Sequence, residues 1–481
     1  MTLTPLTPTA NLPLYEQVAQ RIQGSIEDGT LAPGDRLPSV RRLRHQLSVS
    51  MSTVLEAYRL LEDQGLIMAK PQSGYYVRQT LPLPPEPSSS APPAKGQQID
   101  ISLAQEVNDS VRNRDLLQLG AAVPAVDHLP VAALNRIMGQ VLRAEGAIAH
   151  GYGASFGCAP LQQEVAKRML NAGCSIAPED VVVTNGATEA VYLSLRAVTQ
   201  PGQVVAIESP IYFGMLEMMK SLGLKALELP THPRDGISLT ALEDALKTKA
   251  VAACLMIPTF NNPMGSCMSD ESKKALVDLL NRYDVPLVED DIYGELQFEG
   301  DRPKAVKAFD TEERVLYCSS ISKTLSPGLR VGWSIAGRYQ PQIRRRKLVV
   351  SQMSGIAAQL TVATFFASGG CDRHLRKLRR LNQSQTSHML RTIRAHFPEV
   401  TRVTQPKGGH VLWLEMPPGF DSLALYRQLL LHNISIAPGI MFSAAGRYGN
   451  CFRLNTALPS SPALDQALET IGQMAAQQLR P

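Results

Sequence analysis

The sequence predicts an α/β protein, in which helices cover both faces of a mostly parallel sheet, preceded by a small helical domain. Two observations lead to this prediction. From residue 100 to the end, apolar β-prone runs alternate with helical stretches, which is the pattern of a layered α/β sheet. Residues 81–93 are rich in proline and serine, which favour an extended linker. We therefore expect one domain at 1–79, a linker at 80–99 and a large domain at 100–481.

The composition is that of an ordinary globular protein with more than one domain. Its 481 residues exceed the size at which a single hydrophobic core stops growing. The sequence contains no apolar run of about eighteen residues and opens without a basic, apolar leader, so we expect no membrane span, no secretory signal and a cytoplasmic location. The seven cysteines are scattered without a Cys-x-x-Cys pair, which favours reduced, mostly buried thiols over disulfides or metal ligands.

Three amphipathic helices are predicted in the first domain, beginning near residues 14, 40 and 52, because apolar residues recur there every third or fourth position. The predicted buried stripes are Leu14, Val18, Ile22, Ile26, Val40, Leu43, Leu47, Val54, Tyr58 and Leu61. Ser39 is placed to cap the second helix, and Ser50 or Ser52 the third. Gly65 is the predicted end of the third helix.

A hairpin is predicted after the third helix, because Leu66–Ala69 and Tyr75–Val77 are β-prone runs separated by a turn that contains proline and glycine. Three short helices and a hairpin are the elements of a winged helix-turn-helix, whose last helix enters the major groove of DNA. Five basic side chains fall close together in this region, where they either touch phosphates or form a solvated helix face. They are Arg36, Arg41, Arg42, Arg44 and His45.

Four ordered motifs in this domain resemble the DNA-binding domain of the GntR family. They are the segments Gly34–Arg41, Val49–Tyr58, Leu61–Gly65 and Ser73–Val77. The resemblance implies contacts with double-stranded DNA at the start of the second helix, on or beside the recognition helix and at the wing tip. The implied contact residues are Arg36, Ser39, Arg41, Ser52, Thr53, Arg59 and Gly74. A surface salt bridge is the alternative for Arg41, and Tyr58 is more typical of a core residue than of a reader of bases.

Five buried strands are predicted in the large domain, each followed by a turn or a helix. The strands are the apolar runs that begin at Val181, Val204, Val251, Val285 and Val315. Ligands of α/β sheets bind at the carboxyl ends of the strands, so the residues that follow each run are the candidates for a site.

The first three of these strands are followed by groups suited to an anionic, aromatic ligand. Gly186, Ala187 and Thr188 open a helix after the first strand, and free N–H groups at a helix N-terminus hold phosphate. Tyr212 offers an aromatic face after the second strand, and Asn262 offers an amide donor after the third. Each of these features alone is also typical of a routine turn or packing position.

A carboxylate and a lysine follow the fourth and fifth strands. A buried carboxylate such as Asp290 keeps a neighbouring pyridine nitrogen protonated. A lysine such as Lys323 forms a Schiff base, and its released amine carries protons at the α-carbon of a substrate. Ser320 and Arg330 are placed to complete a phosphate cradle.

Taken in order, these motifs resemble the fold-type I aminotransferases, which bind pyridoxal 5′-phosphate (PLP), over residues 100–481. The resemblance implies a small C-terminal α+β subdomain and three catalytic residues. Lys323 would carry the internal aldimine, Asp290 would pair with the pyridine nitrogen, and Tyr293 with Asn262 would bond the phenolic oxygen of the ring. The other implied cofactor contacts are Ala187, Thr188, Tyr212, Ser320 and Arg330.

The same resemblance implies a homodimer and a carboxylate site. Tyr152 matches the tyrosine that reaches the phosphate bound by the other subunit, with a packing role as the alternative. Arg453, in Cys451–Asn455, matches the arginine that binds the carboxylate of a substrate or effector, which suits a planar bidentate cation.

A GntR-type head joined to an aminotransferase-like body resembles the MocR-type regulators. The resemblance implies a PLP-dependent transcriptional regulator that binds an operator with paired half-sites and senses PLP or an amino compound by aldimine exchange at Lys323. An active aminotransferase of amino acids, for example of 2-amino dicarboxylic acids, remains open. So does a purely structural dimerisation body, which the intact set of site residues disfavours. The basic runs Arg344–Lys347 and Arg373–Arg380 are solvated helix faces or a secondary DNA groove.

Overall fold

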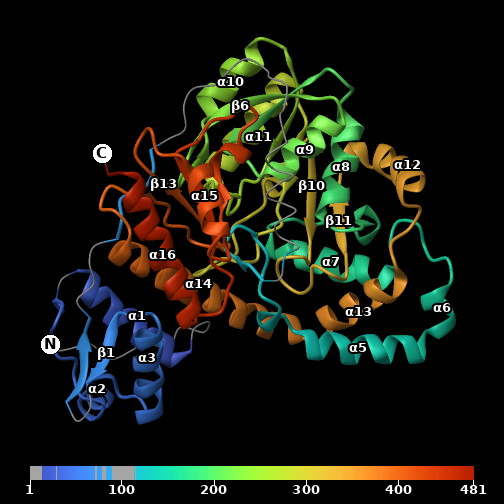
Figure 1. Cartoon of the computed structure of the whole chain (residues 1–481). Helices are drawn as coiled ribbons and strands as arrows, with labels where there is room; N and C mark the ends of the chain where they lie inside the picture. Colours follow the sequence, from blue (N-terminus) through green and yellow to red (C-terminus); the bar gives the residue numbers. More distant parts are fainter. Residues whose placement is uncertain are drawn as a thin grey trace.

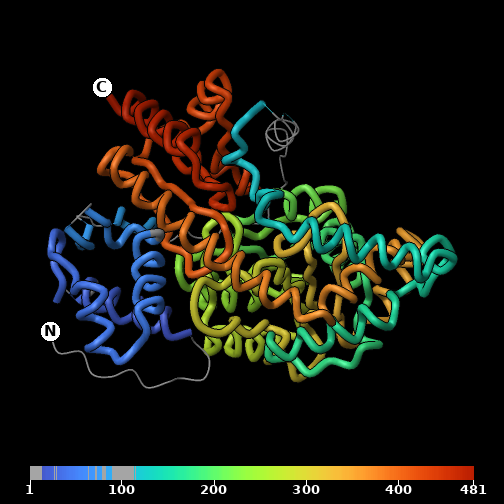
Figure 2. Tube along the Cα trace, turned by 90° about the horizontal axis from the view of Figure 1, so that it is seen from below, coloured from blue at the N-terminus to red at the C-terminus, as the bar shows by residue number. Residues whose placement is uncertain are grey.

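The computed structural model describes residues 13–28, 30–70, 73–78, 83–88, 113 and 115–480. A small head, blue in Figure 1, lies at one corner of a much larger α/β body. Figures 1 and 2 both place this head at the end of the molecule opposite to the short helix α6 (Gly146–His150).

The head is a winged helix-turn-helix. Its elements are helices α1 (Leu14–Glu27), α2 (Val40–Leu47) and α3 (Met51–Asp63), and antiparallel strands β1 (Ile67–Lys70) and β2 (Gly74–Val77). Ser39 caps α2 by accepting a hydrogen bond from the backbone N–H of Arg42, and Ser50 caps α3 by accepting from that of Thr53. Gly65, with a φ of +68°, follows α3 in the left-handed conformation that ends helices.

The predicted stripes form the core of the head, where Ile26 and Val40 are partly buried and pack against it, and Leu14 is the exception. The buried members are Val18, Ile22, Leu43, Leu47, Val54, Tyr58 and Leu61. Leu14 is 44% exposed, because it is the first residue of α1 and lies beyond the part of the helix that packs on the core. Tyr58 is confirmed as a core residue, and its hydroxyl donates to the carbonyl of Pro38 at 2.5 Å.

Within the predicted linker, the structure describes residues 83–88 alone. The carbonyl of Pro85 accepts from the N–H of Val403 at 2.8 Å, and the carbonyl of Pro84 accepts from the Gln405 side chain at 3.2 Å. Glu86 forms an ion pair with Arg234. This stretch therefore docks on the body, since prolines keep their carbonyl acceptors although they lack an N–H.

The body is built on an eight-stranded sheet with the strand order β4-β11-β10-β9-β8-β5-β6-β7. In that order the strands are Val182–Thr184, Gly332–Ile335, Val315–Ser320, Leu287–Asp290, Val251–Met256, Val204–Ser209, Lys225–His232 and Gly236–Ile237. The five strands from β10 to β6 are mutually parallel, whereas β11 and β7 are antiparallel to their neighbours. All five predicted strands are present. The sequence missed β6, β7 and β11 because these strands mix polar residues and glycine with short apolar stretches.

Helices cover both faces of this sheet, as predicted. Val205 and Ile207 pack under one layer of helices, whereas Ala206 between them packs under the other. The first layer is α8 (Ala187–Val198), α9 (Phe213–Ser221) and α12 (Gln340–Val350). The second is α7 (Ala159–Asn171), α10 (Leu239–Lys247), α11 (Asp270–Tyr283) and α13 (Ile356–Ala367), with α5 (Val131–Ala144) beside α13.

The C-terminal part forms the small α+β subdomain that the sequence predicts. Its sheet has the order β12-β13-β16-β15, with strands Arg402–Val403, Val411–Glu415, Cys451–Asn455 and Ala437–Pro438. Its helices are α14 (Gly370–His396), α15 (Ser422–Leu430) and α16 (Pro462–Gln478). Strand β14 (Ile434–Ser435) pairs in parallel with β3 (Leu117–Gln118), which ties the start of the body to the subdomain. Among the described helices, none is both long and apolar enough to cross a membrane.

Candidate cofactor site and nucleic-acid interface

A cavity of about 350 Å³ opens at the carboxyl ends of the parallel strands. This is where open α/β sheets bind their ligands. Nine residues that the sequence singled out, from widely separated segments, line it together. They are Ala187, Thr188, Tyr212, Asn262, Asp290, Tyr293, Lys323, Arg330 and Arg453.

Asp290 and Lys323 provide an acid and a base in this cavity. Asp290 ends β9 and is buried, and its Oδ1 has no hydrogen-bond partner among the described residues. Burial and the neighbouring Asp291 raise the pKa of Asp290 to about 7. Burial and the charge of Arg453 lower the pKa of Lys323 to about 8, and its Nζ donates to the carbonyl of Ala122 at 2.6 Å. Both groups therefore exchange protons near neutral pH.

Arg453 and Tyr293 meet at the amide of Asn262. The amide Nδ2 of Asn262 donates to the Tyr293 hydroxyl at 3.2 Å, and its Oδ1 accepts from Arg453 at 2.8 Å. The guanidinium of Arg453 lies 5.0 Å above the ring of Phe442, and the arginine is only 1% exposed. Burial lowers the pKa of Arg453 to about 10, so the side chain stays cationic at neutral pH and offers an anion site.

The start of α8 forms a cradle for an anion. Gly186 has a φ of +84°, and a Cβ at this position would clash with the guanidinium of Arg330. Arg330 donates to the carbonyl of Asn185 at 2.9 Å. Ser322 lines the cavity, whereas Ser320 does not, and the contact of Ser320 with a phosphate stays a prediction. The hydroxyl of Ser320 donates to that of Ser322 at 3.1 Å.

Two of the three tyrosines that the sequence assigned to the cofactor, Tyr212 and Tyr152, lie in different surroundings. Tyr212 lines the cavity, and burial raises the pKa of its hydroxyl. A Cβ at Gly214 would clash with the Tyr212 ring, so the absence of a side chain at Gly214 makes room for the ring. Tyr152 is 92% exposed and does not line the cavity of its own chain.

The fold adds residues that sequence reasoning missed. Gly120, Ala121, Ala122 and Val123 form one wall of the cavity, and the carbonyl of Gly120 accepts from Arg453. These small residues carry no motif, because they act through backbone carbonyls.

A buried histidine was also missed. His410 packs edge-on against the Tyr293 ring at 5.3 Å between centroids. Burial, then the charge of Lys323, lowers the pKa of His410 to about 3, so the ring is neutral.

The predicted DNA contacts lie on the surface of the head. Six of the seven are exposed and Thr53 is half-buried; the exposed ones are Arg36, Ser39, Arg41, Ser52, Arg59 and Gly74. Ser50 hydrogen-bonds the hydroxyls of Ser52 and Thr53, each at 2.7 Å, and so fixes both at the N-terminus of α3.

At the wing, the Arg36 side chain would lie 3.6 Å from a Cβ added at Gly74. An arginine and the wing tip are thereby brought together, although they are far apart in sequence.

The head contacts the body along α14. Arg380 of α14 forms an ion pair with Glu16 of α1, and Arg391 donates to the backbone carbonyl of Gln64 at the end of α3. A second cavity of about 340 Å³ lies at this junction, lined by α1, α3, α14 and residues 297–301. Figure 2 shows the head beside this part of the body.

Two protein families match the chain. The aminotransferase class I and II family matches residues 114–471, and the bacterial regulatory proteins of the gntR family match residues 14–77. The chain is a MocR-type member of the GntR family. This MocR-type chain joins a DNA-binding head to a body of the aminotransferase class.

Two relatives from Escherichia coli match this chain over nearly its whole length. The MocR-type chain is 37% identical over 462 residues to the uncharacterized HTH-type transcriptional regulator YjiR, covering 95% of this chain and 98% of YjiR. It is also 37% identical to the uncharacterized HTH-type transcriptional regulator YdcR, covering 97% and 99%. A solved structure of LysN, an α-aminoadipate aminotransferase from Thermus thermophilus, has a TM-score of 0.74 and 28% identity, covering 79% of this chain and 96% of LysN.

PLP is the cofactor of this aminotransferase family and of its structural neighbours. The cavity of the MocR-type chain fits PLP on three counts. The unpartnered Oδ1 of Asp290 suits a protonated ring nitrogen, and the amine of Lys323 lies on the cavity wall. The N-terminus of α8, with Gly186 and Arg330 beside it, suits a phosphate.

Proposed function

We propose that this chain is a DNA-binding transcriptional regulator of the cytoplasm that uses its PLP site to sense PLP itself or an amino compound. The observation that carries the proposal is the presence of a lined cofactor cavity and a winged helix-turn-helix in one chain. A sensor needs both a ligand site and an output, and the cavity and the DNA-binding head would supply the two.

The ligand chemistry follows from the residues of the cavity. When bound, PLP supplies an aldehyde that exchanges between the amine of Lys323 and the amine of an effector. With a pKa of about 8, Lys323 exists partly as the free amine at neutral pH, the form that would bond to the aldehyde of the cofactor. Arg453 binds the carboxylate of an effector that has one, and Asp290 holds the proton of the ring nitrogen.

A ligand changes DNA affinity only if it binds two arrangements of the chain with different affinity. The segment after β9 offers a route between the two sites. Tyr293 lines the cavity, and two residues later the carbonyl of Glu295 accepts from Arg379 of α14 at 2.7 Å. The next residue of α14, Arg380, pairs with Glu16 of the head.

On the DNA, we propose that Arg41 reads a base or grips a phosphate, with Arg36 and Gly74 at the wing. A single head makes few contacts, so a homodimer on paired half-sites gains affinity through effective concentration. The exposed Tyr152 then serves the cavity of the other subunit, which accounts for its distance from its own.

An active aminotransferase is the second candidate. It is favoured by the complete set of Asp290, Lys323 and Arg453 in one cavity and by the 28% identity to LysN. A transaminase must also move a proton at the α-carbon and release a keto acid within its turnover time.

A panel of amino acids and amines separates the two candidates. The visible spectrum of the bound cofactor is followed by stopped flow, beside DNA binding with the same ligands. We expect at least one ligand to change the spectrum and the DNA affinity together, with keto-acid formation orders of magnitude slower than the ~10 s⁻¹ of typical enzymes. Fast conversion to the pyridoxamine form, with DNA affinity indifferent to every ligand, would leave an aminotransferase with a DNA-binding appendage.

Arg453→Lys tests the role of the carboxylate site in the same panel. It keeps the positive charge but loses the bidentate geometry, so it should weaken ligands that carry a carboxylate and spare simple amines.

A further inference from the structure

Three consecutive carboxylates, Glu289, Asp290 and Asp291, lie at the end of β9, and all three are buried. Because side chains alternate along a strand, Asp290 faces the cofactor cavity, whereas Glu289 and Asp291 face the other side of the sheet. Glu289 accepts hydrogen bonds from the backbone N–H groups of Val306 and Lys307, at 2.7 and 2.9 Å. Glu289 therefore anchors the backbone at Val306 and Lys307. These contacts do not account for the burial of the second carboxylate, Asp291.

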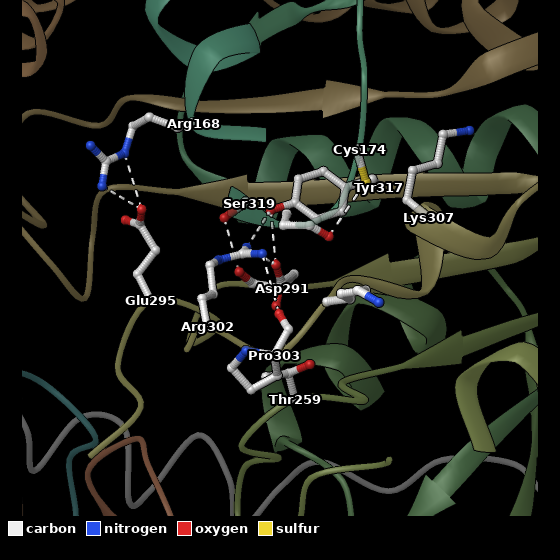
Figure 3. Close-up of polar contacts among 12 residues, drawn as sticks. Arg168, Cys174, Thr259, Asp291, Glu295, Arg302, Pro303, Lys307, Tyr317 and Ser319 are labelled. Atoms are coloured by element: carbon white, nitrogen blue, oxygen red, sulfur yellow. Dashed lines mark hydrogen bonds and ion pairs between the residues drawn. The ribbon is translucent and has the colours of Figure 1, made fainter. Parts of the chain in front are cut away.

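Asp291 is held by partners from several segments (Figure 3). Arg302 forms an ion pair with its Oδ2, and the hydroxyl of Tyr317 donates to the same oxygen at 2.9 Å. The Ser319 hydroxyl donates to the backbone carbonyl of Asp291 at 3.0 Å. Glycine at 294 makes room for the carboxylate, because a Cβ of Gly294 would clash with Oδ1. These buried partners pair the carboxylate with a cation and fix its position.

Arg302 compensates Asp291 but not Asp290. The charged or titratable groups that face Asp290 are Glu208, Asp291, Lys323, Tyr212, Tyr293 and Cys318. Lys323, whose amine the cofactor would take up, is the cation that lowers the pKa of Asp290, and Arg330 and Arg453 line the same cavity. Asp291 is thus an ion-paired carboxylate, held in place by Arg302, on the residue next to the carboxylate that would meet the ring nitrogen.

We propose that Asp291 is a positioning residue, whose charge, fixed by Arg302 and Tyr317, keeps a proton in the contact between Asp290 and the ring nitrogen of PLP. This inference rests on the role of Asp290 in the proposed function. The physical reason is that a neighbouring negative charge makes a proton harder to lose. It agrees with the pKa of Asp290, which burial and Asp291 raise to about 7.

The test is Asp291→Asn in the full-length protein loaded with ¹⁵N-labelled PLP, with the ring nitrogen followed by NMR through a pH titration. Asparagine has the shape of aspartate but lacks its charge, so the ring nitrogen should lose its proton at a pH lower by about one unit or more. Binding of added PLP to the apoprotein, measured above this midpoint, should weaken by about tenfold for each such unit.

Two further variants separate charge from structure. In Asp291→Asn with Arg302→Gln the unpaired cation is also gone, so the midpoint should move back toward that of the unmodified protein. Glu295→Gln is the matched control, because it breaks a partly buried pair with Arg168, 2.5 Å long, on the same side of the sheet but without contact to Asp290. An unchanged midpoint in Asp291→Asn, or an equal change in Glu295→Gln, would overturn the inference.

Asp290→Asn tells a failure of the inference from a failure of the proposed function. If this variant keeps the proton on the ring nitrogen over the same pH range, Asp290 does not hold it, and the role proposed for Asp290 fails. If Asp290→Asn loses the proton and Asp291→Asn does not, only the inference about Asp291 fails.

Discussion

The head and the body expose their functional residues to water in opposite ways. On the head, Arg36, Arg41 and Arg59 are exposed, as suits groups that meet the phosphates of a large partner. In the body, Asp290 is 4% and Arg453 1% exposed, and burial moves the pKa of each toward neutrality. The difference indicates that the head needs only a solvated surface of the right shape. The body instead holds its charged groups in a buried, preorganised site before a ligand binds.

The energetic consequence is that substituting a functional residue should cost less free energy on the head than in the body. Removing a solvated arginine from the head would remove at most its own proposed contact with DNA. Removing a buried charged group from the cavity leaves its partners unpaired, which costs more than the contact itself. The comparison therefore predicts a graded series of effects, beginning in the cavity.

The largest effect is expected for Lys323→Ala. The protein should lose the visible absorbance of the lysine-bound cofactor entirely, because no other described lysine lines the cavity. Its circular dichroism should remain that of the folded protein, since the lysine amine makes one hydrogen bond, to Ala122. Absorbance spectra after dialysis against PLP measure the effect.

Lys220→Ala, at the exposed end of α9, is the control and should keep the spectrum. Visible absorbance retained by Lys323→Ala would contradict the assignment of the cofactor lysine and, with it, the contrast between the two regions.

A smaller effect is expected for Arg41→Ala in the head. DNA binding should weaken by roughly 1–3 kcal/mol if the guanidinium reads a base. The cofactor spectrum should not change, because Arg41 lies on the head far from the cavity lining. Titrations of an operator fragment at several salt concentrations measure both the affinity and its salt dependence.

Arg136→Ala, exposed on α5 of the body, is the matched loss of one positive charge. Equal weakening by the two variants would mean that overall charge, rather than the helix-turn-helix surface, determines binding.

The smallest effect is expected where the two regions meet. Arg380 is 46% and Glu16 18% exposed along their side chains, and ion pairs of this kind contribute about 0.2–1 kcal/mol. Glu16→Gln should therefore change the ratio of DNA affinities with and without ligand, but by less than about fivefold. Ligand binding, followed by the cofactor spectrum in the absence of DNA, should not change. The measurement is the ratio of DNA affinities with and without ligand.

Glu56→Gln serves as the control, because Glu56 pairs with Arg59 within the head at 3.6 Å. An identical ratio in Glu16→Gln and the unmodified chain would remove this pair from the route between the sites.

The sequence by itself determined the local structure of both regions. The helix caps Ser39 and Ser50 each bond a residue three positions away, and the apolar stripes of the head follow the helical period. The five strands read as apolar runs, and their order in the chain located Asp290 and Lys323 at strand ends. These features were predictable because each depends on residues close together in sequence.

Only the tertiary structure decided which side chains meet across the chain. Lys323 donates to Ala122, 201 residues away, and Ser322 rather than Ser320 reaches the cavity wall. Asp291 finds Arg302 behind the sheet, and the neutral His410 packs against Tyr293. None of these contacts has a local signal, because strand order, register and the packing of the C-terminal subdomain set them, and these arise from the fold of the whole chain.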